Sequence, residues 1–149
     1  AAHKVTLAIE PLNRFESDMV NTAEDALRMV QEVNESSVRI ALDGFHMSLE
    51  EKNMEQALVT AGDYLTHIQV AENYRGTPGT GQTDWASWKR GLEKIGYKGA
   101  ISIESFTPEN QSLAGAVCIW KKLADSQDDF ARDGLAFLKN LLNDTGRPA

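Results

Sequence analysis

The chain has 149 residues, of which 42% are hydrophobic and 25% are charged, and this composition is typical of one soluble globular domain, spanning residues 1–149. Its net charge of −7 and its lack of a basic run argue against nucleic acid as a partner, because phosphates are bound by clustered Lys and Arg. No apolar run reaches the roughly 20 residues that span a bilayer, and the opening AAHKVTLAIEP lacks the apolar core of a signal peptide. We therefore expect a cytoplasmic protein that binds neither nucleic acid nor membrane.

The first predicted elements are a strand and a helix. The alternating segment VTLAIE predicts a strand over residues 5–10. The segment TAEDALRMVQEVN predicts an amphipathic helix over residues 22–34, with Asn21 or Thr22 as its cap and acidic residues in its first turn. Its apolar face is predicted to consist of Ala26, Leu27, Val30 and Val33.

The same order of strand, polar loop and amphipathic helix recurs along the rest of the chain. Strands are predicted over residues 38–42 (VRIAL), 66–70 (THIQV) and 100–104 (AISIE). Helices are predicted over residues 49–62, 84–96, 111–124 and 128–142. Gly96 is expected to end the helix before the last strand. Cys118, the only cysteine, is expected to be a small apolar residue on a helix.

A polar residue stands at the end of every predicted strand: Glu10, Asp43, Gln69 and Glu104. Parallel strands place their carboxyl ends at one edge of the sheet, where α/β barrels and open parallel sheets carry their sites. Because an eight-unit barrel needs about 250 residues, four strand-helix units amount to half of one. We expect an α/β fold of the (β/α)8 barrel type, present as a fragment or as a half that another chain completes.

The strand-end residues suit a divalent cation. Three carboxylates crowded together raise one another's pKa values, whereas a divalent ion holds all three ionised. Oxygen ligands of this kind suit Mn²⁺, Mg²⁺ or Co²⁺, and Gln69 can add an amide oxygen. A metal there can polarise the oxygens of a hydroxy-ketone, while Glu10 and Glu104 remove and return a proton, which gives epimerisation or aldose-ketose isomerisation.

Simpler roles exist for each of these residues. An acid after a strand is often only a helix cap, His46 can be a loop hydrogen bonder, and Arg75 can pair with Glu72 or with a surface acid. Trp85 and Trp88 are expected in the core or an interface rather than in a sugar-stacking platform. The glycines of the loop over residues 76–81 do not match a phosphate-binding signature and are expected to provide turns.

Four segments carry a family resemblance: IEPLNRFESDMVNT, LDGFHMSLEE, HIQVAENYRGTPGTGQTDW and ISIESF. They resemble, in order and spacing, the C-terminal half (strands 5–8) of sugar epimerases and isomerases with a xylose isomerase-like TIM barrel, in particular the D-tagatose or D-psicose 3-epimerases. The resemblance implies that Glu10 and Glu104 are catalytic carboxylates that also bind the metal, and that Asp43 is a third ligand. It further implies that Glu16, His46 and Arg75 hold substrate oxygens, that the metal is Mn²⁺ or else Co²⁺ or Mg²⁺, and that the protein forms dimers or tetramers.

The chain departs from the 3-epimerases at Gln69. These enzymes carry a metal-binding His at this place, in the pattern H-x-H, whereas hydroxypyruvate isomerase-like relatives resemble this chain in having H-x-Q. We interpret Gln69 as a ligand through its carbonyl oxygen and His67 as a neighbour that is not a ligand. Gly44, where the epimerases often carry a bulkier residue, is a second departure.

Three functions remain open at this point. The first is a metal-dependent sugar epimerase or isomerase, and the second is a hydroxypyruvate isomerase-like enzyme. The third is a non-catalytic sugar-binding half-barrel. An apurinic endonuclease on the same kind of barrel is disfavoured, because it needs several His ligands and a basic groove, and the chain has three His and a net charge of −7.

Overall fold

The protein is described by a computed structural model for residues 4–143. Its strands form one parallel sheet in the order β1-β2-β3-β4. They span Leu7–Ile9, Val38–Asp43, Leu65–Val70 and Ala100–Ile103. The strands predicted from alternation are confirmed, with ends that differ by at most two residues.

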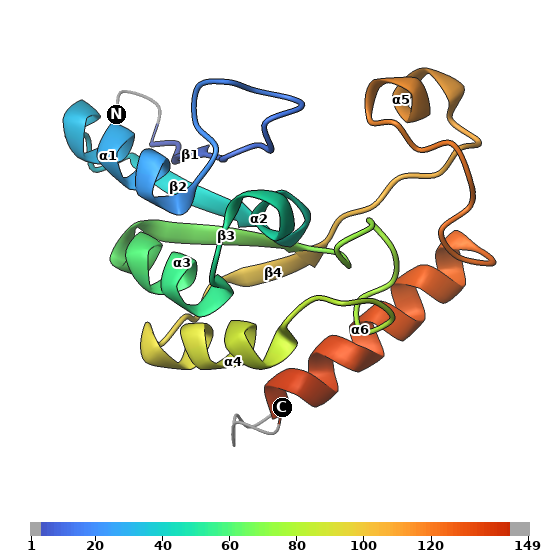
Figure 1. The fold of residues 1–149 in the computed structure, drawn as a ribbon. Helices are drawn as coiled ribbons and strands as arrows, with labels where there is room; N and C mark the ends of the chain where they lie inside the picture. The colour runs from blue at the N-terminus through green and yellow to red at the C-terminus, as the bar shows by residue number, and fades with distance from the viewer. Residues whose placement is uncertain (1–3, 144–149) are drawn as a thin grey trace.

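Helices form a row along one face of the sheet, in the order α1 (Ala23–Val33), α3 (Met54–Ala61), α4 (Trp85–Lys94) and α6 (Gln127–Asn143), each in contact with the next. Figure 1 shows α1, α3 and α4 beside the strands, with α6 continuing the row past β4. The core lies between these layers and contains the fully buried Ile40, Leu42, Ile68 and Val70 of the two central strands. On β3 the alternating positions His67 and Gln69 are only half-buried, so they belong to the other face.

The N-terminal end of α1 confirms Thr22 as the cap. The Thr22 hydroxyl accepts a hydrogen bond from the Asp25 backbone N–H at 3.1 Å, and the Asp25 carboxylate accepts one from the Thr22 backbone N–H at 3.2 Å. Ala26 and Val30 are buried as predicted. Val33 is 46% exposed, so its place on the buried face was wrong; it is the last residue of α1.

The predicted helix over residues 49–62 is wrong in its extent. The structure has two helices, α2 (Gly44–Glu50) and α3, followed by the short 3-10 helix η1 (Gly62–Tyr64). Two side-chain caps explain the division. Asp43 accepts from the Phe45 backbone N–H at 2.7 Å, which starts a helix directly after β2, and Asn53 accepts from the Gln56 N–H at 2.9 Å, which starts a second one.

The helix predicted over residues 84–96 is confirmed as α4. Asp84 accepts a hydrogen bond from the Ser87 backbone N–H at 3.0 Å and caps the helix. Gly96 follows the C-cap Ile95 with φ of +58°, the left-handed conformation that glycine adopts most readily.

The predicted helix over residues 111–124 is also wrong in its extent. It ends early, as α5 (Gln111–Ala116), and Cys118 is an exposed residue with φ of +57° outside any helix. The expectation of a helical apolar cysteine is therefore wrong, because a left-handed residue cannot continue a right-handed helix. Figure 1 shows α5 apart from the sheet, on a long connection between β4 and α6. The last predicted helix is confirmed as α6.

The described sheet has two outer strands, β1 and β4, as the half-barrel prediction requires. Near β1, Val5 and Leu7 are 59% and 64% exposed. Apolar residues beside an unpaired strand edge favour covering by further structure. Within residues 4–143, none of the helices is long and apolar enough to cross a membrane.

Candidate active site

The strand-end residues meet at the carboxyl edge of the sheet. Asp43 and Gln69 are register partners on β2 and β3, and the Glu104 backbone N–H continues the β3–β4 ladder by donating to the Val70 carbonyl at 3.0 Å. Glu10 follows directly after β1. The Gln69 amide Nε2 donates to Glu104 Oε1 at 2.6 Å. Three of the four predicted ligand positions are therefore adjacent across neighbouring strands.

Arg75 joins this group from the loop between β3 and α4. Its Nη1 donates to Asp43 Oδ2 at 2.6 Å and to Glu104 Oε2 at 2.9 Å. The side chain is 6% exposed, and its guanidinium lies 4.1 Å from the centroid of the Phe45 ring. The alternative in which Arg75 only pairs with Glu72 or a surface acid is wrong, because its ion-pair partner Asp43 is buried and 32 residues away.

His46 lies on α2 rather than in a loop, and it is 3% exposed. Its Nδ1 accepts a hydrogen bond from the Asn13 backbone N–H at 3.1 Å. Burial and then the nearby Arg75 charge lower the pKa of His46, which favours the neutral ring. Its Nε2 lies 3.3 Å from Arg75 Nη2, which can only donate, and 4.0 Å from Asp43 Oδ2. His46 thus directs Nε2 toward the Asp43–Arg75 pair.

Glu16 is exposed in the loop after β1, where its Oε1 accepts from Asn13 Nδ2 at 2.8 Å. Asn13 is 2% exposed and connects Glu16 with His46, because the same Nδ2 lies 2.9 Å from His46 Nδ1. Sequence reasoning missed Asn13. Its only signal was its place in the EPLNRFE segment, since no periodicity distinguishes a buried loop asparagine from an exposed one.

The carboxylates perturb one another. Burial and then the charges of Asp43 and Glu104 raise the pKa of Glu10 from 4.5 to about 7, although Arg75 opposes the rise. Burial, followed by hydrogen bonding and repulsion from Asp43, also raises the pKa of Glu104. A single guanidinium therefore leaves this group of acids short of positive charge. A divalent cation would supply that charge, so the donor chemistry fits a hard metal ion.

Ligand atoms of Glu10, Asp43 and His46 lie within 4.8 Å of one another and can hold a metal ion. The predicted ligand set shares Glu10 and Asp43 with this group and contains Gln69 and Glu104 in place of His46. His67, predicted not to be a ligand, has its Nε2 2.9 Å from the Ser102 hydroxyl. The ligand set and the catalytic and substrate-binding roles stay predictions.

Trp85 and Trp88 lie in or against the core, and the loop over residues 76–81 contains a glycine with a turn conformation, as the sequence predicts. Trp88 is 1% exposed and belongs to the hydrophobic core. Trp85 packs against Phe137, with ring centroids 5.2 Å apart. A Cβ at Gly44 would lie 3.1 Å from the Trp88 ring, so a larger residue there requires the ring to shift. Gly79 has φ of +89°, which supports the prediction that the loop glycines provide turns.

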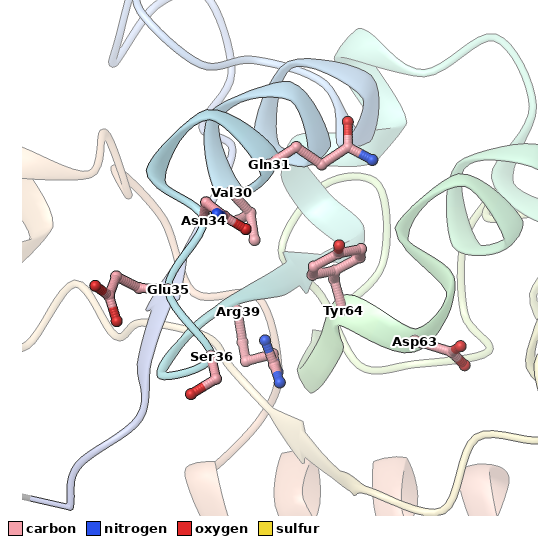
Figure 2. Close-up of a pocket in the computed structure, with 8 residues that line it drawn as sticks. All are labelled: Val30, Gln31, Asn34, Glu35, Ser36, Arg39, Asp63 and Tyr64. Carbon is pink, nitrogen blue, oxygen red and sulfur yellow. The ribbon is translucent and has the colours of Figure 1, made fainter.

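A cavity lies elsewhere, at the end of α1 and beside η1 (Figure 2). It has a volume of about 560 Å³, and in it the Arg39 guanidinium lies 5.8 Å from the centroid of the Tyr64 ring. It borders the start of β2, whereas the carboxylates lie at the end of β2. We place the active site at the carboxylates, because parallel α/β sheets carry their chemistry at the carboxyl ends of the strands.

The fold and this site match one class of protein: the chain belongs to the xylose isomerase-like TIM barrel family, whose family model matches residues 1–141. Among its relatives, L-ribulose 3-epimerase of Methylomonas sp. (strain DH-1) is 36% identical over 137 residues, which are 91% of this chain and 48% of that protein. D-psicose 3-epimerase of Agrobacterium fabrum is 34% identical over 143 residues, which are 93% of this chain and 50% of that protein.

Solved structures agree with these relatives. A structure of L-ribulose 3-epimerase has a TM-score of 0.92 at 33% identity. The match covers 96% of this chain and 49% of the L-ribulose 3-epimerase chain. A structure of D-psicose 3-epimerase with D-tagatose from Clostridium cellulolyticum H10 has a TM-score of 0.89 at 34% identity. The match covers 95% of this chain and 50% of the D-psicose 3-epimerase chain. The chain therefore spans about half the length of the relatives it matches. The predicted family and the barrel-type fold, of which about half is present, are confirmed.

Proposed function

We propose that the protein is a ketose 3-epimerase that depends on a divalent metal ion, with Mn²⁺ expected first and Mg²⁺ or Co²⁺ as alternatives. One observation carries the proposal: Glu10 and Glu104, both with raised pKa values, flank the buried Asp43–Arg75 pair at the carboxyl edge of the sheet. Without a bound metal ion the pKa of Glu10 is about 7, at which a carboxyl group can both accept and donate a proton at neutral pH. The 3-epimerase relatives support the same reaction class.

In the proposed reaction, one of the two glutamates accepts the proton of C3, and the C–H electron pair moves toward the neighbouring ketose carbonyl to give an enediolate. The other glutamate, in its acid form, donates a proton to C3 from the opposite face and inverts the configuration. One C–H bond breaks and one forms, so no redox cofactor is needed. A divalent ion held by Glu10, Asp43, Gln69 and Glu104 would polarise the substrate carbonyl and hydroxyl oxygens.

The substrate is held by polar groups around the carboxylates. We assign this role to Glu16, His46 and Arg75. The guanidinium of Arg75 is a donor that suits sugar hydroxyl and carbonyl oxygens, the ring Nε2 of His46 can bond to a sugar hydroxyl, and Glu16 is an acceptor for hydroxyl protons. Asn13 supports this arrangement because it orients both Glu16 and His46.

Gln69 supports a second candidate, a hydroxypyruvate isomerase-like enzyme that acts on a smaller hydroxy-carbonyl compound. Its amide nitrogen donates to Glu104, so the same side chain can orient an acid-base residue and present an oxygen to a metal. A third candidate is a sugar-binding half-barrel without catalysis. It is supported because the chain spans about half the length of its relatives and because its open sheet exposes Val5 and Leu7.

The proposed partners are a sugar substrate and either a second half of the barrel or further copies of the chain.

The test is deuterium uptake from D₂O, followed by NMR with the full natural polypeptide. Candidate substrates are D-psicose, D-tagatose, L-ribulose and hydroxypyruvate, each with Mn²⁺ and with EDTA. Metal-dependent uptake at C3 of a ketose supports the epimerase, and exchange with hydroxypyruvate alone supports the second candidate. Binding of a sugar with no exchange in any sample would contradict both enzymatic proposals and support the third.

A further inference from the structure

A carboxylate outside the proposed set of catalytic and ligand residues is fully enclosed. Glu72 follows β3 and is 0% exposed. Its Oε1 accepts from the Gly79 backbone N–H at 2.7 Å and from the Trp85 indole N–H at 2.7 Å. Its Oε2 accepts from the Thr83 backbone N–H at 3.1 Å. The Asn73 backbone N–H also donates to Oε2 at 3.4 Å, so four donors from the loop and from the start of α4 converge on one buried side chain.

This arrangement requires a carboxylate. Both oxygens accept from N–H donors, and a glutamine has only one accepting oxygen, so its NH₂ would face a donor. Burial acts to raise the pKa of Glu72, but hydrogen bonds from Thr83, Trp85 and Gly79 outweigh it and hold the pKa below its ordinary value. The charge is thus compensated by N–H dipoles rather than by a cation.

Glu72 also closes the turn that carries Arg75. The Glu72 N–H donates to the Gly76 carbonyl at 2.9 Å, and the Arg75 N–H donates to the Glu72 carbonyl at 2.8 Å. Arg75 has φ of +65°, a left-handed conformation that is unfavourable for a residue with a side chain. Such a conformation persists only where surrounding contacts determine it, and the Glu72 backbone supplies two of these contacts.

We propose that Glu72 is a positioning residue: its buried carboxylate folds the loop over residues 72–83 and thereby holds Arg75 against Asp43 and Glu104. The proposal rests on the proposed function in one respect, the role of Arg75 at a sugar site. The hydrogen bonds of the Glu72 side chain run to Asn73, Gly79, Thr83 and Trp85, so it acts through the loop and the start of α4. Without it, the left-handed turn relaxes and the Arg75 guanidinium leaves the carboxylates.

The first test uses amide hydrogen exchange in the full natural polypeptide and is independent of turnover. Glu72→Gln should speed exchange of the Gly79 and Thr83 amides by at least about tenfold and should shift the Arg75 guanidinium resonances. The matched control is Glu55→Gln, which removes a carboxylate that pairs with Arg90 on α4 and should leave both signals unchanged. Wild-type exchange or an unmoved Arg75 resonance in Glu72→Gln would overturn the proposal.

If Glu72→Gln does not fold, Trp85→Phe removes the indole donor together with part of the ring and keeps a smaller aromatic ring in its place. It should give a smaller increase in Gly79 exchange and a smaller shift of the Arg75 resonances, both in the same direction. Unchanged signals in this variant would overturn the proposal in the same way.

The second test is a double-mutant cycle on kcat/KM with Glu72→Gln, Arg75→Ala and both together. If Glu72 acts through Arg75, the double variant is no slower than Arg75→Ala alone. Losses that multiply would show that Glu72 acts independently of Arg75 and would overturn the proposal. Absence of turnover in the wild type would contradict the proposed function instead, while the exchange experiment would still decide the role of Glu72.

Discussion

The ionisation of Glu10 gives the sharpest stability prediction, because its pKa is about 7 in the fold against 4.5 for an unperturbed side chain. Between these two pH values the folded state binds more protons than the unfolded state, so the free energy of unfolding falls as pH rises. At about 1.4 kcal/mol per pH unit the interval corresponds to roughly 3 kcal/mol. Because Glu10 is only half-buried and is partly screened by water, we expect about 1–2 kcal/mol.

The perturbation is Glu10→Gln, which has nearly the same shape and no charge. In EDTA, urea unfolding of the full natural polypeptide should show the variant more stable than the wild type by about 1–2 kcal/mol at pH 8 and equally stable at pH 4. Glu50→Gln is the control of opposite sign, because the Arg14 hydrogen bonds lower the pKa of Glu50 and its loss should destabilise the protein above pH 4.5. A Glu10→Gln variant that is no more stable than the wild type at pH 8 would refute the repulsion argument.

Substitutions at three further positions test the site. Glu104→Gln should abolish deuterium exchange into the substrate while the circular dichroism spectrum is kept, and full activity would contradict its acid-base role. Gln69→Ala should weaken Mn²⁺ binding by calorimetry and Gln69→His should retain it, whereas unchanged affinity in Gln69→Ala would count against Gln69 as a ligand. Arg75→Met leaves buried Asp43 without its cation and should cost about 3–5 kcal/mol in urea unfolding without metal; a loss below about 1 kcal/mol would show that the pair is solvated.

Local patterns in the sequence determined the strands and their order along the chain. The alternation of apolar and polar side chains and the polar residue at each strand end depend only on residues that are adjacent in the chain. Asp43 and Gln69 could therefore be placed at one edge of the sheet before any contact was known. Helix starts were visible where a cap is followed by an acidic turn, as at Thr22. Helix ends were less visible: an Asn cap at Asn53 and a left-handed Cys118 divide segments whose apolar pattern continues past them.

Only the tertiary structure decided which polar groups meet. Arg75 reaches Asp43 and Glu104 across 32 and 29 residues, and Asn13 reaches His46 across 33. Whether the Glu72 carboxylate forms an ion pair or accepts hydrogen bonds from N–H groups likewise depends on how the loop folds over it. The physical reason is that periodicity reports which face of an element is apolar, whereas the partner of a buried polar group is fixed by packing between elements distant in the chain.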